Sequence, residues 1–361
     1  MNLRQSLLSD RSRRYFLRSS LLGVLSLAML ACDSVSYYGQ AARGQLAILV
    51  SRQDIESLLQ GSGLPDNRRL KLEAVLRIRD FARQEMLLPA GGSYGSYVEL
   101  DREHVVWNVF AAPEFSLDPV TWCYSLAGCV SYRGYFSEDA ARRFAAQLTG
   151  QGYDVYVGGV DAYSTLGWFD DPLLSTVLDR ADHQLAGLIF HELAHQLVYV
   201  PGDTTFNESF ASTVEREGVR RWLTAQGDPG QLGIVHADLA RQGAFVDLVM
   251  SFQSDFQTLY GSGSDTRTMR EGKAQLQARM RQAYASLRSS WDGYGGYDRW
   301  FDGPLNNAQI GSVAAYNDLV PAMQGILTHM DYDLSRFYRE IQRLAALPAD
   351  EREAALHTPG P

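Results

Sequence analysis

Two histidines four residues apart, His191 and His195, stand inside a stretch that is otherwise almost entirely apolar. Glu192 is the only charged residue between Leu185 and Val200, so the stretch suits a largely buried helix. On a helix, positions i and i+4 lie on one face, one turn apart. Glu192 is rotated from His191 by about 100°, because a helix has 3.6 residues per turn. The chain must therefore fold so that two neighbouring imidazoles on a buried helix meet a common partner.

Two imidazoles on one face of a helix can bind one zinc ion, and such a site needs a third protein ligand. Glu208 lies thirteen residues after His195, in the run Asn-Glu-Ser-Phe-Ala at 207–211, which opens a second predicted helix. We predict one zinc ion per chain, bound by His191, His195 and Glu208, with a coordination position left open for water. Glu192 is the predicted general base that deprotonates this water.

The segment between the two predicted helices has the residues of a turn. Pro201-Gly202 ends the first helix, so the chain can turn back and bring Glu208 beside the histidines. Glu215 lies two turns beyond Glu208 on the same face, and we predict that it orients a ligand histidine by accepting its other N–H. The structural alternatives are a solvated Glu215, and a buried helix whose histidines are only hydrogen-bonded.

The metal motif resembles that of a known group of enzymes. His191-Glu192-x-x-His195, followed by Asn207-Glu208-Ser209-Phe210-Ala211 and Glu215, is similar to the pattern of the gluzincin metallopeptidases, above all the zinc aminopeptidases. Most of the chain after residue 31 also resembles a bacterial family of predicted aminopeptidase lipoproteins. The runs that carry this second resemblance are 107–115, 123–136, 163–169 and 306–317. The resemblance implies a zincin-like α+β fold and hydrolysis of peptide bonds.

Two departures from the zinc aminopeptidases concern specificity. The spacer between His195 and Glu208 is shorter than in the best-known members, and the chain has no G-x-M-E-N segment, which in those enzymes grips the free amine of the substrate. We expect a zinc peptidase, an aminopeptidase by resemblance, that acts on a peptide or protein. An envelope endopeptidase, a cell-wall amidase and a non-catalytic metal-binding envelope lipoprotein are the alternatives.

Three further positions are candidates for substrate contacts. Tyr316 and Arg133 could donate hydrogen bonds to the oxyanion that forms during hydrolysis, although aromatic residues near helices usually serve packing. The run Tyr163-Ser164-Thr165 could form the edge strand that pairs with an extended peptide, or it could belong to the core.

Residues 1–31 have the layout of an export signal peptide. A basic stretch with Arg13-Arg14, which resembles the twin-arginine export motif, precedes an uncharged apolar run at 20–31. Cys32 follows at the position where a bacterial lipoprotein carries its lipidated cysteine. We therefore expect a lipoprotein anchored to a membrane on the periplasmic side of the cell envelope. A plain signal peptide and an uncleaved anchor are the alternatives, with Cys32 an incidental thiol.

The other two cysteines, Cys123 and Cys129, would be joined as a disulfide in an oxidising compartment, where the bond would fix a local turn. Two reduced, buried thiols are the alternative. Segment 1–31 carries five arginines and one aspartate, a charge of +4, so the remainder of this chain of net charge −9 carries −13. Because an acidic surface repels phosphate backbones, we expect no nucleic-acid partner.

Residues 32–361 are predicted to form a single zincin-like metallopeptidase domain of the α+β class. A tether and a helix are expected at 33–63, and a helix capped by Asp66 should run to about Gln84. Strands at 104–110 and 153–157 flank a helix at 138–148 that Ser137 caps, which together predict a small sheet. Further helices are expected near 174–199, 206–226, 235–260, 266–290, 306–330 and 332–346.

Overall fold

The computed structural model describes residues 37–124, 128–227 and 229–357. The chain divides into two units, Met1–Ser51 and Arg52–Pro361, and in the first of them residues 37–50 form a helix. None of the described helices is both long and apolar enough to cross a bilayer. The predicted export segment 1–31, with its Arg13-Arg14 pair, and the predicted lipidation site Cys32 lie outside the described residues.

The described part of the second unit contains three small sheets. In the first, β3 (Val106–Pro113) pairs antiparallel with both β6 (Arg133–Tyr135) and β7 (Tyr153–Val160), which gives the order β6-β3-β7. The remaining strands form the sheet β1-β2-β8 and the pair β4-β5, with bounds β1 (Gln53–Asp54), β2 (Ser96–Val98), β8 (Leu173–Leu174), β4 (Trp122–Tyr124) and β5 (Gly128–Val130).

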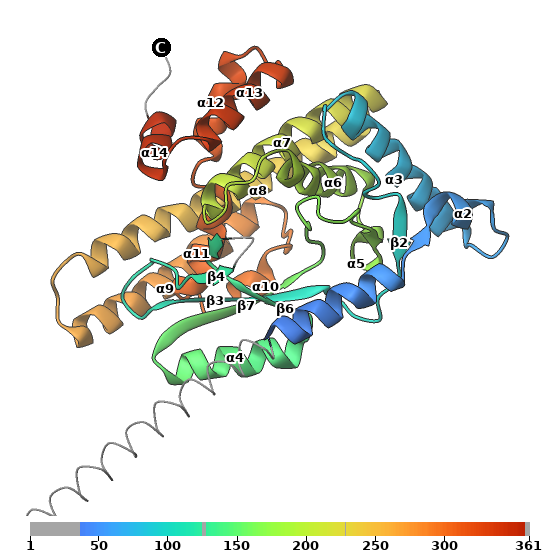
Figure 1. The fold of residues 1–361 in the computed structure, drawn as a ribbon. Helices are drawn as coiled ribbons and strands as arrows, with labels where there is room; N and C mark the ends of the chain where they lie inside the picture. The colour runs from blue at the N-terminus through green and yellow to red at the C-terminus, as the bar shows by residue number, and fades with distance from the viewer. Residues whose placement is uncertain (1–36, 125–127, 228, 358–361) are drawn as a thin grey trace, which may run out of the picture. The chain divides into compact units, whose positions relative to one another are not determined.

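Helices make up most of the second unit, above all after β8. Helices α4 and α11 cover opposite faces of the β6-β3-β7 sheet, and α6 and α7 lie side by side on the α11 side (Figure 1). The bounds are α2 (Ile55–Gln60), α3 (Asp66–Gln84), α4 (Glu138–Gly150), α5 (Ser175–Leu178), α6 (Asp182–Leu197), α7 (Thr204–Gln226), α8 (Pro229–Tyr260), α9 (Thr266–Ser290), α10 (Asp298–Phe301), α11 (Asn307–Asn317), α12 (Val320–His329), α13 (Leu334–Ala345) and α14 (Ala349–His357).

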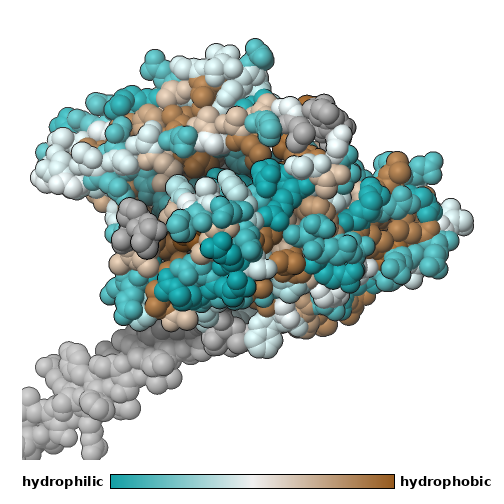
Figure 2. Space-filling view, turned by 90° about the horizontal axis from the view of Figure 1, so that it is seen from above, coloured by the Kyte–Doolittle hydropathy of each residue, from teal (hydrophilic) through white to brown (hydrophobic). Residues whose placement is uncertain are grey.

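Two apolar clusters hold these helices together. The larger one joins α3, α6, α7 and α13, and includes the fully buried rings of Phe190, Phe210 and Phe337. The second joins α8, α9 and α11 around Phe256 and Met280. On the face shown in Figure 2, hydrophobic residues lie in small groups among hydrophilic ones. The predicted metal ligands therefore belong to helices that the larger cluster fixes.

The α+β class is confirmed, with small sheets before residue 175 and helices after it. Ser137 caps α4 by accepting a hydrogen bond from the Ala140 N–H, as predicted. The prediction for Asp66 is wrong in detail: Pro65 occupies the cap position, and Asp66 is the first residue of α3. An acidic residue there still interacts favourably with the positive end of the helix.

Two helices that were predicted to be continuous are interrupted. The expected helix at 174–199 breaks before α6, where Lys71 donates to the Arg180 carbonyl and to the Asp182 carboxylate, both at 2.7 Å. The expected helix at 306–330 divides into α11 and α12. Pro321 stands in the first turn of α12, and proline cannot donate the hydrogen bond that would continue α11.

The possible edge strand Tyr163–Thr165 does not form. These residues lie outside every described strand, because Asp171 accepts hydrogen bonds from the Thr165 N–H at 3.0 Å and from its hydroxyl at 2.6 Å. A backbone N–H that is used in this way cannot pair with a neighbouring strand. The segment is therefore a loop held by Asp171.

Candidate metal centre

Helices α6 and α7 approach closely because glycines occupy the places where they touch. A Cβ atom on Gly218 would lie 2.3 Å from the Phe190 ring, so the absence of a side chain lets this ring lie against α7. A Cβ atom on Gly187 would lie 3.1 Å from Val219 and 3.2 Å from Glu215. This close packing brings polar side chains of the two helices within reach of one another.

The turn between α6 and α7 is fixed by side-chain hydrogen bonds. Asn207 accepts from the Val200 N–H at 2.7 Å and donates to the Val200 carbonyl at 2.8 Å, as a neighbouring strand would. Asp203 caps α7 by accepting from the Phe206 N–H at 3.0 Å. Asn207 thereby sets the position of the next residue, Glu208, relative to the end of α6.

The three predicted ligands meet at one point. Glu208 Oε2 lies 3.2 Å from His191 Nε2 and 3.5 Å from His195 Nε2, and one ligand atom from each residue lies within 4.8 Å of the others. A tetrahedral zinc ion with bonds of about 2.0–2.2 Å would separate its ligand atoms by about 3.4 Å. Two imidazole nitrogens and one carboxylate oxygen at these separations fit such an ion.

The two histidines differ in the support that they receive. Glu215 Oε2 lies 3.1 Å from His191 Nδ1. An ionised carboxylate can only accept, so Nδ1 carries a hydrogen that it donates to Glu215, and Nε2 is the nitrogen that would bind a metal ion once the ion displaces its proton. Glu215 thus lies where it was predicted to orient a ligand. His195 Nδ1 is buried and has no hydrogen-bond partner among the described residues, so this ring lacks the second carboxylate that His191 has in Glu215.

The carboxylates make the centre attractive to cations. Burial would raise the pKa of Glu208, but the charges and hydrogen bonds of His195 and His191 outweigh it and lower this pKa to about 2. Burial would lower the pKa of His191, yet hydrogen bonds and charges from Glu208 and Glu215 hold it well above 6.5. The negative charges of Glu208 and Glu215 would likewise attract a metal cation, which has to displace the proton to bind His191.

Glu192 lies beside these ligands on α6 and is not one of them. Its residue is 8% exposed, and burial raises the pKa of its carboxyl group against the opposing charges of His191 and His195. A carboxylate that takes up a proton more readily than usual is a better general base. The placement of Glu192 is therefore compatible with its predicted role.

Tyr316 brings a phenol to the same place from α11. Its ring stacks on the imidazole of His191, with centroids 6.4 Å apart and planes inclined by 21°. Arg216 of α7 donates to the side chain of Asn317 at 3.2 Å, which ties this end of α11 to the metal helices. Burial, followed by the charge of Glu208, raises the pKa of Tyr316 well above 10. The phenol therefore stays protonated and can donate a hydrogen bond.

Arg133 is not brought to the centre. Its guanidinium lies over the ring of Phe144, 4.6 Å from the centroid, and Phe144 belongs to α4 on the far face of the sheet. The preceding residue, Tyr132, lies just outside β6, and its ring contacts that of Phe110 with centroids 5.7 Å apart. Tyr132 contributes to the raised pKa of Tyr316, after burial and Glu208. The predicted oxyanion role of Arg133 is therefore not supported.

Sequence reasoning missed two phenols that the fold brings to the centre. Burial and then the charge of Glu192 raise the pKa of Tyr94, and burial and then the charge of Glu208 raise that of Tyr199. Tyr94 is buried with a left-handed backbone, φ +59°, which is uncommon for a residue with a side chain. The only sequence signal was the glycine-rich run 91–97, which indicates a loop and nothing about its neighbours.

A disulfide closes a hairpin that packs against the turn between α6 and α7. Cys123 and Cys129 are opposite residues of β4 and β5 and are joined by a disulfide bond. Gly128 has φ +74° and packs so tightly that a Cβ atom would lie 2.5 Å from the Gly202 nitrogen. The hairpin thus rests on the turn that precedes Glu208, and the disulfide limits how far the hairpin can open.

Comparison with known proteins gives one match. The model of a family described as "Putative aminopeptidase" matches residues 36–356. This span includes the metal helices, the β6-β3-β7 sheet and α11. No curated protein and no solved structure matches the chain.

Proposed function

The chain belongs to this family of "putative aminopeptidases", and from that premise we propose that it is a zinc-dependent peptidase that removes residues from the amino terminus of peptides. One observation carries the metal part of the proposal: His191, His195 and Glu208 converge from two helices at separations that suit a single ion. The buried carboxylate of Glu192 beside them supports catalysis, because a purely structural metal site has no use for a base.

The residues of the centre have separate roles in binding the metal ion. His191, His195 and Glu208 hold the zinc ion, and Glu215 keeps His191 in the tautomer that can bind it. When bound, the ion polarises a carbonyl group and makes water acidic enough to lose a proton near neutral pH.

Proton transfer and charge stabilisation fall to two further side chains. Glu192 accepts the proton of the attacking water at a carboxylate oxygen and passes it to the nitrogen of the departing amine, which balances the hydrolysis of the peptide bond. Tyr316 donates its phenol O–H to the carbonyl oxygen as negative charge develops there. The raised pKa of Tyr316 keeps this donor protonated.

A library of free peptides, analysed by mass spectrometry of the products, tests the proposal. The purified full chain should contain one zinc ion, shorten peptides from the amino terminus, and lose activity with a chelator. His191→Ala should lose both metal and activity. Internal cleavage would replace the aminopeptidase by an endopeptidase. Tight zinc binding without any cleavage would favour the non-catalytic metal-binding protein.

We also propose that the protein is a lipoprotein of the cell envelope, on the strength of Arg13-Arg14, the apolar run 20–31 and Cys32. Cys32→Ala should move the protein from the membrane to the soluble fraction. Replacing both arginines with lysine should leave uncleaved precursor in the cytoplasm. Equal membrane association of wild type and Cys32→Ala would refute lipidation.

A further inference from the structure

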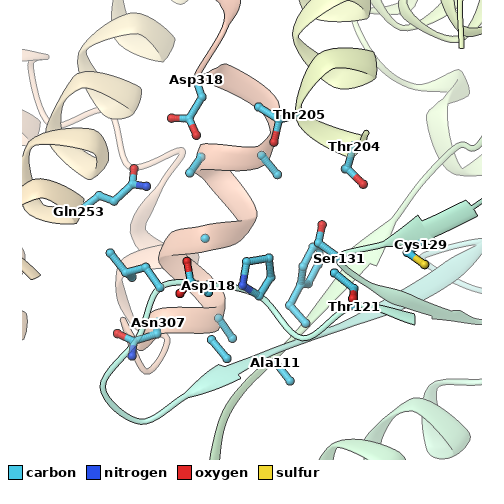
Figure 3. A pocket seen from close by; sticks show the side chains of 18 of the residues that line it. Ala111, Asp118, Thr121, Cys129, Ser131, Thr204, Thr205, Gln253, Asn307 and Asp318 are labelled. Atoms are coloured by element: carbon cyan, nitrogen blue, oxygen red, sulfur yellow. The ribbon is translucent and has the colours of Figure 1, made fainter. Parts of the chain in front are cut away.

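A pocket of about 330 Å³ lies next to the metal centre without including its ligands. Its walls come from β3, β5, the loop 117–121, the first turn of α7, α8 and α11 (Figure 3). Ligand pockets begin at about 300 Å³, so this one has room for a group the size of one amino-acid side chain. The question is which chemical group its lining would accept.

Two buried polar atoms of the lining have no hydrogen-bond partner among the described residues. Ser131 is only 9% exposed, and its Oγ faces the pocket with no hydrogen-bond partner in the described part of the chain. The buried Oε1 of Gln253 is likewise unpaired among the described residues. A native protein rarely leaves buried polar atoms unpaired unless a ligand or water completes them. These two atoms therefore point to an occupant that brings polar groups of its own.

The charged residues of the lining are all acidic. Asp118 and Asp318 both line the pocket at exposed positions, and among the described residues no lysine, arginine or histidine is paired with either carboxylate. Asp118 accepts a hydrogen bond from the Ser116 hydroxyl at 2.9 Å. Asp203, the third acidic residue there, is already paired with Arg352 at 2.7 Å. No lysine, arginine or histidine lines the pocket. An occupant that carries positive charge would meet two carboxylates whose charge no described cation neutralises, whereas an anion would be repelled.

The pocket is within reach of a peptide bound at the metal centre. Thr204 and Thr205 line it and precede Glu208 by four and three residues on α7, which places them on its face about 4.5–6 Å along the axis. An extended peptide advances about 3.3–3.6 Å per residue. The side chain of a residue one or two positions from the bond that is cleaved can therefore reach the pocket.

We propose that this pocket is a substrate subsite for a cationic nitrogen group, an ammonium or a guanidinium, which Asp318 and Asp118 bind by charge-assisted hydrogen bonds. The proposal rests on the proposed peptidase function. The group comes either from a lysine or arginine side chain or from the free amino terminus of the peptide. Ser131 and Gln253 complete the contacts at the buried end of the pocket.

Matched peptides test this subsite in the full-length protein. The two peptides of a pair carry lysine or norleucine at one position near the cleaved bond and are otherwise identical, and their kcat/KM values are compared. Each pair is made once with a free and once with an acetylated amino terminus. We expect a preference of about tenfold for the cationic member, the usual value of a charged hydrogen bond. Dependence on lysine identifies the side chain as the source, and dependence on the free terminus identifies the terminal amine.

Substitutions of the two aspartates test whether the preference for cationic peptides arises in the pocket. Asp318→Asn and Asp118→Asn should bring the ratio of kcat/KM close to one, while Asp350→Asn, an exposed position on α14, should leave it unchanged. Equal rates for cationic and neutral peptides, or a preference that survives both pocket variants, would overturn the subsite.

A binding measurement tests the proposed subsite independently of the proposed peptidase activity. If no peptide is cleaved, the lysine and norleucine peptides are titrated into the Glu192→Gln variant by calorimetry, and their affinities are compared. Binding of the lysine peptide about tenfold tighter, lost in Asp318→Asn, would preserve the subsite although peptidase activity had failed. Equal binding of the two peptides would reject it.

Discussion

Two helix hairpins of similar architecture bury very different residues. Helices α6 and α7 bury five or more polar groups between them, among them Glu192, His195, Glu208 and Glu217. In α8 and α9, Lys273 is the single buried charged or polar residue among those whose burial the structure describes. The apolar core of that second pair consists of rings and long side chains such as Phe256 and Met280.

The contrast shows where chemistry and where stability reside. A buried charge costs free energy unless it is paired, so a fold keeps a cluster of them only where other groups compensate them or a ligand needs them. The α6–α7 pair meets that cost with mutual ion pairs at the candidate metal site. The α8–α9 pair has only Lys273 to compensate, through Asp154 at 2.5 Å. Substitutions in the first pair should therefore affect activity, and those in the second should affect folding.

The largest expected effect comes from Glu192→Gln. This change keeps the shape of the side chain and removes the base, so hydrolysis should fall by about 10²–10⁴-fold while zinc content and unfolding midpoint remain those of wild type. Activity assays, metal analysis and denaturant titration measure the three quantities. Glu208→Gln is the matched control: it should weaken zinc binding, and added zinc should restore part of the activity. Equal loss of zinc in both variants would contradict the division of roles.

The second prediction is that substitutions in the α8–α9 hairpin change the stability of the protein. Phe256 of α8 is fully buried, so Phe256→Ala should lower the free energy of unfolding by about 3–5 kcal/mol. Activity per folded molecule should stay close to wild type. Ile234→Ala, at a position on α8 that is 61% exposed, should change the unfolding free energy little. A loss of activity in Phe256→Ala without loss of stability would remove the contrast between the hairpins.

Local patterns were sufficient to predict the second hairpin and most other helices. The predicted helix 266–290 coincides with α9, where Asp265 provides the cap and an apolar stripe provides the buried face. The strands β1, β2, β4, β5, β6 and β8 were missed, because two or three residues give no period to detect. The breaks before α6 and α12 depend on Lys71 and on Pro321, and only the latter is visible in the local sequence.

The metal ligands were predictable because they follow from helix geometry. His191 and His195 are one turn apart, and the turn at 201–202 had to return the chain for Glu208 to join them. The phenols Tyr94 and Tyr199 reach the centre through the tertiary fold, which no spacing encodes. The placement of Arg133 over Phe144 depends on the register of β6, which decides the face that each side chain takes and which the sequence does not encode locally.

A third prediction tests the close packing of α6 and α7. A methyl group on Gly218 would collide with Phe190, so Gly218→Ala should destabilise the protein by about 1–3 kcal/mol and weaken zinc binding as the helices separate. Gly243→Ala is the matched control on α8, where a Cβ atom meets nothing within 4 Å. There alanine should stabilise the helix by up to about 1 kcal/mol. The same sign of effect at both glycines would show that the two hairpins pack alike.

The smallest expected effect concerns ion pairs, and one ion pair from each hairpin is compared. Glu217 of α7 is 3% exposed and accepts hydrogen bonds from Arg220 at 2.7 Å and Arg221 at 2.6 Å. Burial would raise the pKa of Glu217, but these bonds and charges outweigh it and lower the pKa below its usual value of 4.5. A lowered folded-state pKa means that the contribution is complete above the unfolded-state pKa and disappears as the pH falls through the folded-state value.

Glu217→Gln should therefore lower the free energy of unfolding by about 1 kcal/mol at pH 7, and the difference from wild type should shrink as the pH falls below about 4.5. Denaturant titrations over this pH range measure it. The matched pair on α9, Arg267 with Glu271, is exposed at both ends, and solvent screens such pairs almost completely. Glu271→Gln should thus show no measurable change at either pH. The two hairpins differ in the burial of their carboxylates. An equal effect of both substitutions would mean that this burial does not determine how much an ion pair contributes to the free energy of unfolding.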